Sequence, residues 1–168
     1  MLIFIFSFIP FILDYIFNLF MPYLSNNLSI FNTCFTIVTI ALIYPLFKEN
    51  KNYLIFLIFY GIIYDLFFTG LFVYDGLIFL LLGLITIYFN SNLENNYINT
   101  ITYILFLLFI YFGIYSSFMF IFNVVPINFY KFIYIFIHSI LSNVIYSTII
   151  YLIIYKLNED KKKRKYIR

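Results

Sequence analysis

The chain has 168 residues, of which 65% are hydrophobic and 10% are charged, and its formal net charge is +3. Soluble domains carry about 25% charged residues, so a water-soluble fold of this length would have too few polar side chains to cover its surface. The composition therefore predicts an integral membrane protein, with lipid as the solvent for most of the chain. It leaves no room for a separate soluble catalytic domain.

Apolar segments separated by short polar breaks predict an all-α, polytopic bundle of about six transmembrane helices, each needing about 20 residues. The breaks fall at prolines, glycines and asparagine-rich stretches. The fourth segment is short for a hydrocarbon core of about 30 Å, so a five-span arrangement, with the third and fourth segments as a re-entrant pair, is the alternative. The first segment has no basic start and is interpreted as a retained helix rather than a signal peptide. The expected spans are residues 2–20, 28–47, 53–69, 76–89, 100–122 and 130–156.

The basic residues predict the orientation, because Lys and Arg are enriched in cytoplasmic loops. Lys48 and Lys51 share one loop, and a basic cluster lies at the C-terminus. Six spans place both on the cytoplasmic side of the membrane, with both termini inside, and only Lys131 falls outside. The chain then divides into a transmembrane domain, residues 1–157, and a basic tail, residues 158–168. This tail accounts for the net charge, so we expect it to meet membrane lipid and expect no nucleic-acid partner.

Four ionisable side chains lie in or beside the spans: Asp14, Asp65, Asp75 and His138. Such a group costs about 2.5–3.5 kcal/mol on insertion scales, so each one suggests a function. With a helical rise of about 1.5 Å per residue, Asp14, Asp65 and His138 are expected to lie at a similar depth in the membrane. We expect them to form interhelical hydrogen bonds that fix packing, and a buried proton or cation site is the alternative. Asp75 is expected to cap the fourth helix while facing water.

Small and hydroxyl-bearing residues recur at helical spacing in the last two spans. Ser139, Asn143 and Ser147 are four residues apart and therefore share one face of the sixth span. Gly113 and the two serines that follow it form a similar notch in the fifth. Such residues let helices approach closely. We expect packing within the protein, and contact with another membrane protein is the alternative.

The residues that catalysis would need are missing from the sequence. The single cysteine, Cys34, excludes an intrachain disulfide and a multi-Cys metal site. With one histidine there is no Ser-His-Asp set, and no His, Asp and Glu residues have metal-ligand spacing. No phosphate-binding glycine loop occurs, and no Arg lies in a span. We therefore expect a protein that is not an enzyme and has no catalytic residues, cofactor or metal.

The third and fourth segments carry spaced glycines around one aspartate. Gly61 and Asp65 are four residues apart and share a helix face, where a glycine lets a neighbouring backbone approach and the carboxyl can bond its polar groups. Gly70 and Gly76 supply permissive residues for the turn. The pattern reads Gly61-Ile-Ile-Tyr-Asp65-Leu-Phe-Phe-Thr-Gly70, then Tyr74-Asp75-Gly76 and Leu82-Gly83. It resembles the signature hairpin of the rod shape-determining protein MreD family.

The resemblance implies a non-enzymatic membrane scaffold of the bacterial cell-elongation complex, which builds peptidoglycan and sets rod shape. Members associate with MreC and, through it, with MreB, RodA and a class B penicillin-binding protein, so partners of these kinds are expected. The family is distantly similar in fold to substrate-binding S-components of energy-coupling-factor vitamin transporters, which supply the alternative function. S-components dock through an Ala-x-x-x-Ala face, and this chain has one alanine, Ala41. The candidate structural and partner-binding residues are Gly61, Asp65, Gly70, Gly76, Asp14, His138, Ser139 and Asn143.

Overall fold

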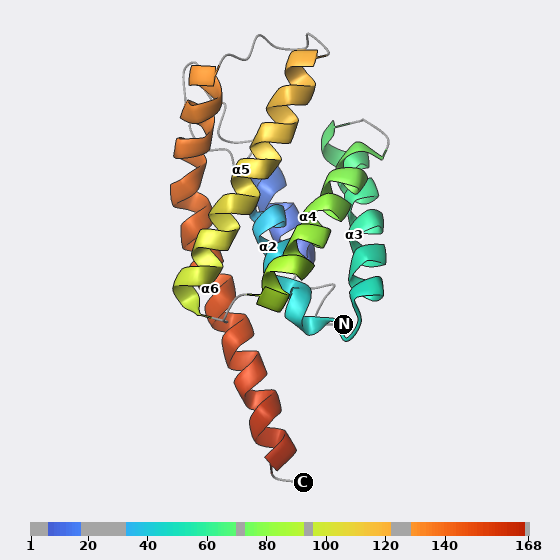
Figure 1. Ribbon diagram of the computed structural model, residues 1–168, viewed down its shortest axis with the longest axis vertical. Coiled ribbons are helices and arrows are strands. Elements are labelled where there is room, and N and C mark those ends of the chain that lie inside the picture. The colour runs from blue at the N-terminus through green and yellow to red at the C-terminus, as the bar shows by residue number, and fades with distance from the viewer. Residues whose placement is uncertain (1–6, 18–32, 70–72, 93–95, 122–128, 167–168) are drawn as a thin grey trace.

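The computed structural model describes residues 7–17, 33–69, 73–92, 96–121 and 129–166, and these are helical with no strand among them. The all-α prediction is confirmed. Successive helices run in alternating directions, as the colours in Figure 1 show. The helices are Ser7–Phe17, α2 (Phe35–Ile43, continued by the 3-10 turn Tyr44–Leu46), α3 (Asn50–Tyr64, continued by the π-helical turn Asp65–Thr69), α4 (Tyr74–Asn92), α5 (Tyr97–Ile121) and α6 (Phe129–Tyr166).

Each segment that was predicted to be helical overlaps one of these helices, but some boundaries differ. The fourth helix is 19 residues long instead of the expected segment 76–89. At its polar end, Nδ2 of Asn90 donates to the carbonyl of Thr86, one turn earlier, at 3.2 Å. The sixth helix continues through the basic tail to Tyr166, since Lys, Arg and Glu are good helix formers. Residues 28–32 of the second expected span lie outside the described residues.

Among the described residues, two helices are long and apolar enough to cross a membrane: Tyr97–Phe118, with 22 residues, and Phe132–Ile154, with 23. In each apolar stretch 33% is buried inside the protein, and its other described residues are partly or fully exposed. The helices Ser7–Phe17, Phe35–Leu46 and Tyr74–Asn90 are apolar but shorter. The described helices therefore combine two full-length candidate spans with several shorter apolar segments.

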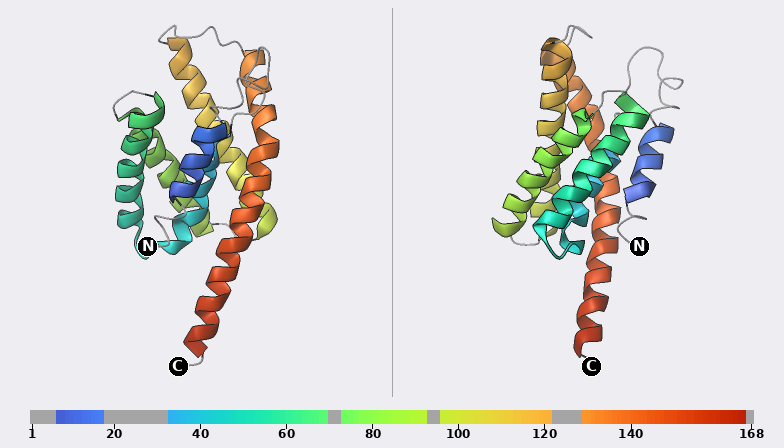
Figure 2. Two further views of the ribbon diagram at one scale, coloured as in Figure 1. Left: turned by 180° about the vertical axis from the view of Figure 1, so that it is seen from behind. Right: turned by 90° about the vertical axis from the view of Figure 1, so that its right-hand side faces the viewer.

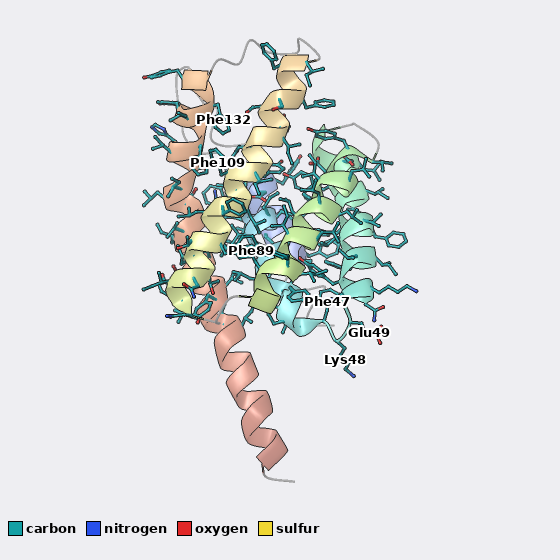
Figure 3. The ribbon with its side chains drawn as sticks, viewed as in Figure 1. Phe47, Lys48, Glu49, Phe89, Phe109 and Phe132 are labelled. Carbon is teal, nitrogen blue, oxygen red and sulfur yellow. The ribbon has the colours of Figure 1, made fainter. Side chains whose placement is uncertain are left out.

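The short helix α2 lies at the centre of the bundle. Each of its residues from Phe35 to Ile43 is buried, and it packs against α4, α5 and α6. The helix Ser7–Phe17 lies in front of α2 in the left view of Figure 2, which shows the molecule from behind. The helices α3 and α4 form an antiparallel pair with extensive contact, and α5 packs along α6. In this second pair the rings of Phe109 and Phe132 meet edge to face, with centroids 5.6 Å apart (Figure 3).

The charged side chains Lys48 and Glu49, which are exposed, lie at the lower end of the bundle in Figure 3. The C-terminal part of α6 projects from the same end (Figure 1). The two regions that carry the basic residues other than Lys131 therefore lie toward one end of the molecule.

Candidate functional site

A buried carboxylate joins the first helix to α2. Asp14 is 0% exposed, and its two oxygens accept hydrogen bonds from the backbone N–H groups of Phe35 (2.9 Å) and Thr36 (2.8 Å). These residues begin α2, and the first N–H groups of a helix have no partner within it. A negative charge at this position is also stabilised by the helix dipole. Asp14 therefore caps α2 from a different helix.

The helix α6 completes this cap. Oδ1 of Asn143 accepts the N–H of Cys34 at 3.0 Å, and its Nδ2 donates to the carbonyl of Ser139 at 2.8 Å. Asn143 is 0% exposed, and Cys34 directly precedes α2. Three successive N–H groups at the start of α2 therefore bind side chains from two other helices, which fixes where this central helix begins.

Further hydroxyl groups hold α2 along its length, and the sequence analysis missed them. The hydroxyls of Thr39 and Tyr146 are 2.8 Å apart, and the hydroxyl of Tyr53 donates to the carbonyl of Ile40 at 3.0 Å. These bonds tie α2 to α6 and to α3. These bonds could have been predicted from the tyrosines inside apolar helices, because a buried tyrosine hydroxyl usually finds a hydrogen-bond partner.

The helices α3 and α4 touch backbone to backbone at two glycines. A Cβ atom added to Gly61 would lie 2.4 Å from Cα of Gly76 and 2.6 Å from its nitrogen. Real Cβ atoms do not come so close, so only glycine permits this separation of the two helices. The expectation that Gly61 allows a neighbouring backbone to approach is confirmed, and Gly76 supplies that backbone. The third glycine of the pattern, Gly70, lies outside the described residues.

One turn after this contact, Asp65 binds the first N–H groups of α4. It is 1% exposed, and its Oδ1 and Oδ2 accept the N–H of Asp75 at 3.0 and 2.9 Å. Oδ2 also lies 3.4 Å from the nitrogen of Gly76. Asp65 opens the π-helical turn Asp65–Thr69 at the end of α3. Its carboxylate therefore caps α4 across the hairpin, as Asp14 caps α2.

The two aspartates thus serve two separate helix ends. The expected interhelical hydrogen bonds of Asp14 and Asp65 are confirmed, and both go to backbone N–H groups. His138 differs, because its Nδ1 lies 2.8 Å from the carbonyl of Tyr134 and its ring packs on that tyrosine, with centroids 4.0 Å apart. Both contacts are within α6, one turn apart, and are not the interhelical bond that we expected for His138.

The expectation that Asp75 faces water is wrong. Asp75 lies in the first turn of α4 and is 0% exposed, and its two carboxyl oxygens have no hydrogen-bond partner among the described residues. Asp65, and not Asp75, supplies the carboxyl oxygens that accept backbone N–H groups at the start of α4, those of Asp75 and Gly76. Its side chain points into the protein because the Gly61–Gly76 contact presses the start of α4 against α3.

The two predicted small-residue faces have different outcomes. Ser139, Asn143 and Ser147 are each 0% exposed, so their packing within the protein is confirmed. At Gly113, by contrast, an added Cβ would meet nothing within 4 Å, and the hydroxyl of Ser117 donates to the carbonyl of Gly113 in its own helix. The expectation of close packing inside the protein at this notch is therefore wrong.

The polar groups of this site hold helices together through charge-assisted hydrogen bonds, which are stronger than neutral ones. Among the described residues, no three His, Cys, Asp or Glu side chains are grouped as a metal ion would require. No family model, curated protein or solved structure matches this chain. The role of the site is therefore inferred from its own residues, and their hydrogen bonds fix the positions of the helices.

Proposed function

We propose that this protein is a membrane-embedded, non-enzymatic scaffold of the bacterial cell-elongation complex, as its resemblance to the MreD family implies. One observation carries the proposal. Two glycines and the aspartate of the signature hairpin meet at one place, where Gly61 lies against Gly76 and Asp65 binds N–H groups at the start of α4. The spaced glycines and the aspartate thus have a joint role in building one rigid helical pair.

The distribution of side chains supports the membrane location. Polar groups lie inside the bundle, where Asp14, Asp65 and Asn143 are at most 1% exposed. Large apolar side chains lie outside, which in water would favour aggregation but in lipid is the expected arrangement. Those that are 63–68% exposed include Phe59, Leu66, Leu77, Ile98 and Leu141. The proposal is a multi-pass protein with about six spans and both termini in the cytoplasm.

A scaffold role is supported by what the buried polar groups do. The carboxylates of Asp14 and Asp65 and the amide of Asn143 bind backbone N–H groups of neighbouring helices, so they stabilise one arrangement of the bundle. A rigid bundle suits a protein that presents a fixed surface to a partner. We propose an MreC-like protein as the direct partner, with MreB, RodA and a class B penicillin-binding protein reached through it.

The proposal is tested by purifying the tagged full chain from membranes of its host with mild detergent and identifying what copurifies. The MreC-like protein should be recovered with the native chain. It should be retained with Gly113→Ala, where the added methyl group meets open space, and lost with Gly61→Leu. The Gly61→Leu chain must be present in the membrane at normal levels for the comparison to count. Recovery of an energising ATPase module and a bound vitamin, without the MreC-like protein, would instead identify a vitamin transporter component.

A second readout is cell shape. Depletion of the protein should round rod-shaped cells, and the native chain should restore the rods while Gly61→Leu should not. Normal growth and shape after complete depletion would contradict the proposed role in cell elongation.

A further inference from the structure

The α3–α4 hairpin contains a buried carboxyl group that its neighbours do not satisfy. Asp75 is 0% exposed, and neither of its carboxyl oxygens has a hydrogen-bond partner among the described residues. An ionised carboxylate in such a position is very costly, because water has been removed and no donor replaces it. The group must therefore be neutralised by a proton or by a cation.

The polar side chain next to Asp75 is another carboxyl group, that of Asp65. Two carboxylates cannot hydrogen-bond to each other, because both are acceptors only, whereas a protonated carboxyl can donate to an ionised one. Asp65 already accepts the backbone N–H groups of Asp75 and Gly76, so its oxygens serve as acceptors. Asp75 has no such donors and is the group that takes the proton.

The other titratable groups around Asp75 come from each of the elements that pack nearby, and none of them carries a positive charge. They are the phenols of Tyr64, Tyr74, Tyr111 and Tyr115 and the thiol of Cys34. With no basic side chain in this set, the described residues offer no ion pair for an ionised Asp75. Because both carboxyl oxygens are completely buried, a proton fits beside them more easily than a larger metal cation.

We propose that the Asp65–Asp75 pair is a proton-binding site, in which Asp75 is protonated and donates its hydroxyl to the carboxylate of Asp65. The pair then holds one proton and one negative charge. Asp65 then accepts hydrogen bonds from the N–H of Asp75, the N–H of Gly76 and the carboxyl of Asp75. The proton links the side chains of the two helices at the point where the backbones of Gly61 and Gly76 touch.

Loss of this proton would place two negative charges side by side in a buried site. It would also turn the donor between the two carboxyl groups into a second acceptor. The start of α4 would then be repelled from the end of α3, so the hairpin should loosen at the pH at which the proton leaves. The inference concerns the chemistry of this pair and does not depend on the identity of the partner protein.

Infrared spectroscopy of the purified full chain in lipid vesicles tests the proposal directly. A protonated carboxyl group has a carbonyl stretching band that is separate from that of a carboxylate. The native chain should show this band at neutral pH, and Asp75→Asn should lose it. Asp14→Asn is the matched control, because Asp14 has its own N–H donors, and this variant should keep the band. A band that survives in Asp75→Asn, or that is absent from the native chain, would overturn the proposal.

Thermal unfolding of the same samples separates a proton from a metal cation. Asp75→Asn keeps a donor toward Asp65 and should unfold close to the native temperature, while Asp75→Leu should unfold at a lower one. The native unfolding temperature should fall from mildly acidic to alkaline pH, and that of Asp75→Asn should change much less. Stabilisation of the native chain by Na⁺, K⁺, Mg²⁺ or Ca²⁺ over choline at equal ionic strength, lost in Asp75→Asn, would identify a cation site instead. If Asp75→Leu does not insert into membranes, the infrared band of the native chain still decides the question.

Discussion

A Cβ atom on Gly61 would lie 2.4 Å from Cα of Gly76, but the reverse substitution meets no such obstacle. A Cβ on Gly76 would have its nearest neighbours at 3.5 Å, the carbonyl oxygen of Ile58 and Cγ1 of Ile62, which is ordinary van der Waals contact. The separation of α3 and α4 is therefore limited by Gly61. The contact lies one turn before Asp65, so it also sets how closely the Asp65 carboxylate approaches α4.

Gly61→Ala should destabilise the protein by about 1–3 kcal/mol, the usual cost of overpacking, because the new methyl group overlaps backbone that cannot rotate away. Gly76→Ala should cost clearly less. Gly113→Ala is the control, since it adds the same methyl group to a helix at an open position and should be neutral or stabilising by up to about 1 kcal/mol. Thermal unfolding in detergent measures all three. Equal effects of Gly61→Ala and Gly113→Ala would disprove the close contact.

Substitutions at Asp65 should separate hydrogen bonding from charge. Asp65→Asn keeps an acceptor for the N–H of Asp75 and should retain most of the stability and partner binding. Asp65→Leu leaves the N–H groups of Asp75 and Gly76 without an acceptor, and buried unsatisfied donors cost about 1–3 kcal/mol each. Copurification of the partner and thermal unfolding report both effects. If Asn and Leu were equally damaging in chains that insert at normal levels, the role of Asp65 would be to handle charge and not to cap α4.

Asp14 should behave in the same way at the start of α2. Asp14→Leu removes the acceptor for the N–H groups of Phe35 and Thr36 and should cost about 1–3 kcal/mol or more, whereas Asp14→Asn should cost less. Ser117→Ala is the control, because that exposed hydroxyl bonds only within its own helix. Hydrogen exchange of the α2 amides measures the local effect. Unchanged protection of these amides in Asp14→Leu would contradict the cap.

Val73 has a positive φ of 73°, directly before α4. A β-branched residue is strained in this left-handed region, at a cost of about 1–2 kcal/mol. Val73→Gly should therefore raise the unfolding temperature, although the greater freedom of glycine in the unfolded chain offsets about 0.5–1 kcal/mol of the gain. Val73→Ala retains a Cβ and should gain little. A lower unfolding temperature for Val73→Gly would mean that packing of the valine outweighs the strain.

The proposed topology has six spans with both termini in the cytoplasm. A reporter that is active only in the periplasm should be inactive when fused after Lys48 or Lys165 and active when fused in the segment between α5 and α6. A reporter that is active only in the cytoplasm should give the opposite pattern. Periplasmic activity after Lys165 would require an odd number of spans and would overturn the model.

Composition and periodicity were enough to predict the all-α class of this protein, which the described residues confirm. The high apolar content predicted helices throughout, and the glycines, prolines and asparagine-rich breaks located them to within a few residues for α3 and α5. The spacing of Ser139, Asn143 and Ser147 was enough to place these residues on one buried face, because helical geometry alone relates residues four apart. Local rules work for these features because each depends on neighbours in the chain.

The partners of the buried carboxylates were decided by tertiary structure. Helical rise placed Asp14, Asp65 and His138 at one level, but it could not show that each aspartate binds the start of the following helix, 10 to 22 residues away. Asp75 looked like a water-facing cap because its sequence neighbours suit that role. It is buried because Gly61 and Gly76 bring two backbones into contact and Asp65 takes its place as the cap. The free N–H groups at a helix start bind whichever acceptor the packing of the other helices brings to them, and that packing is not encoded in any local pattern.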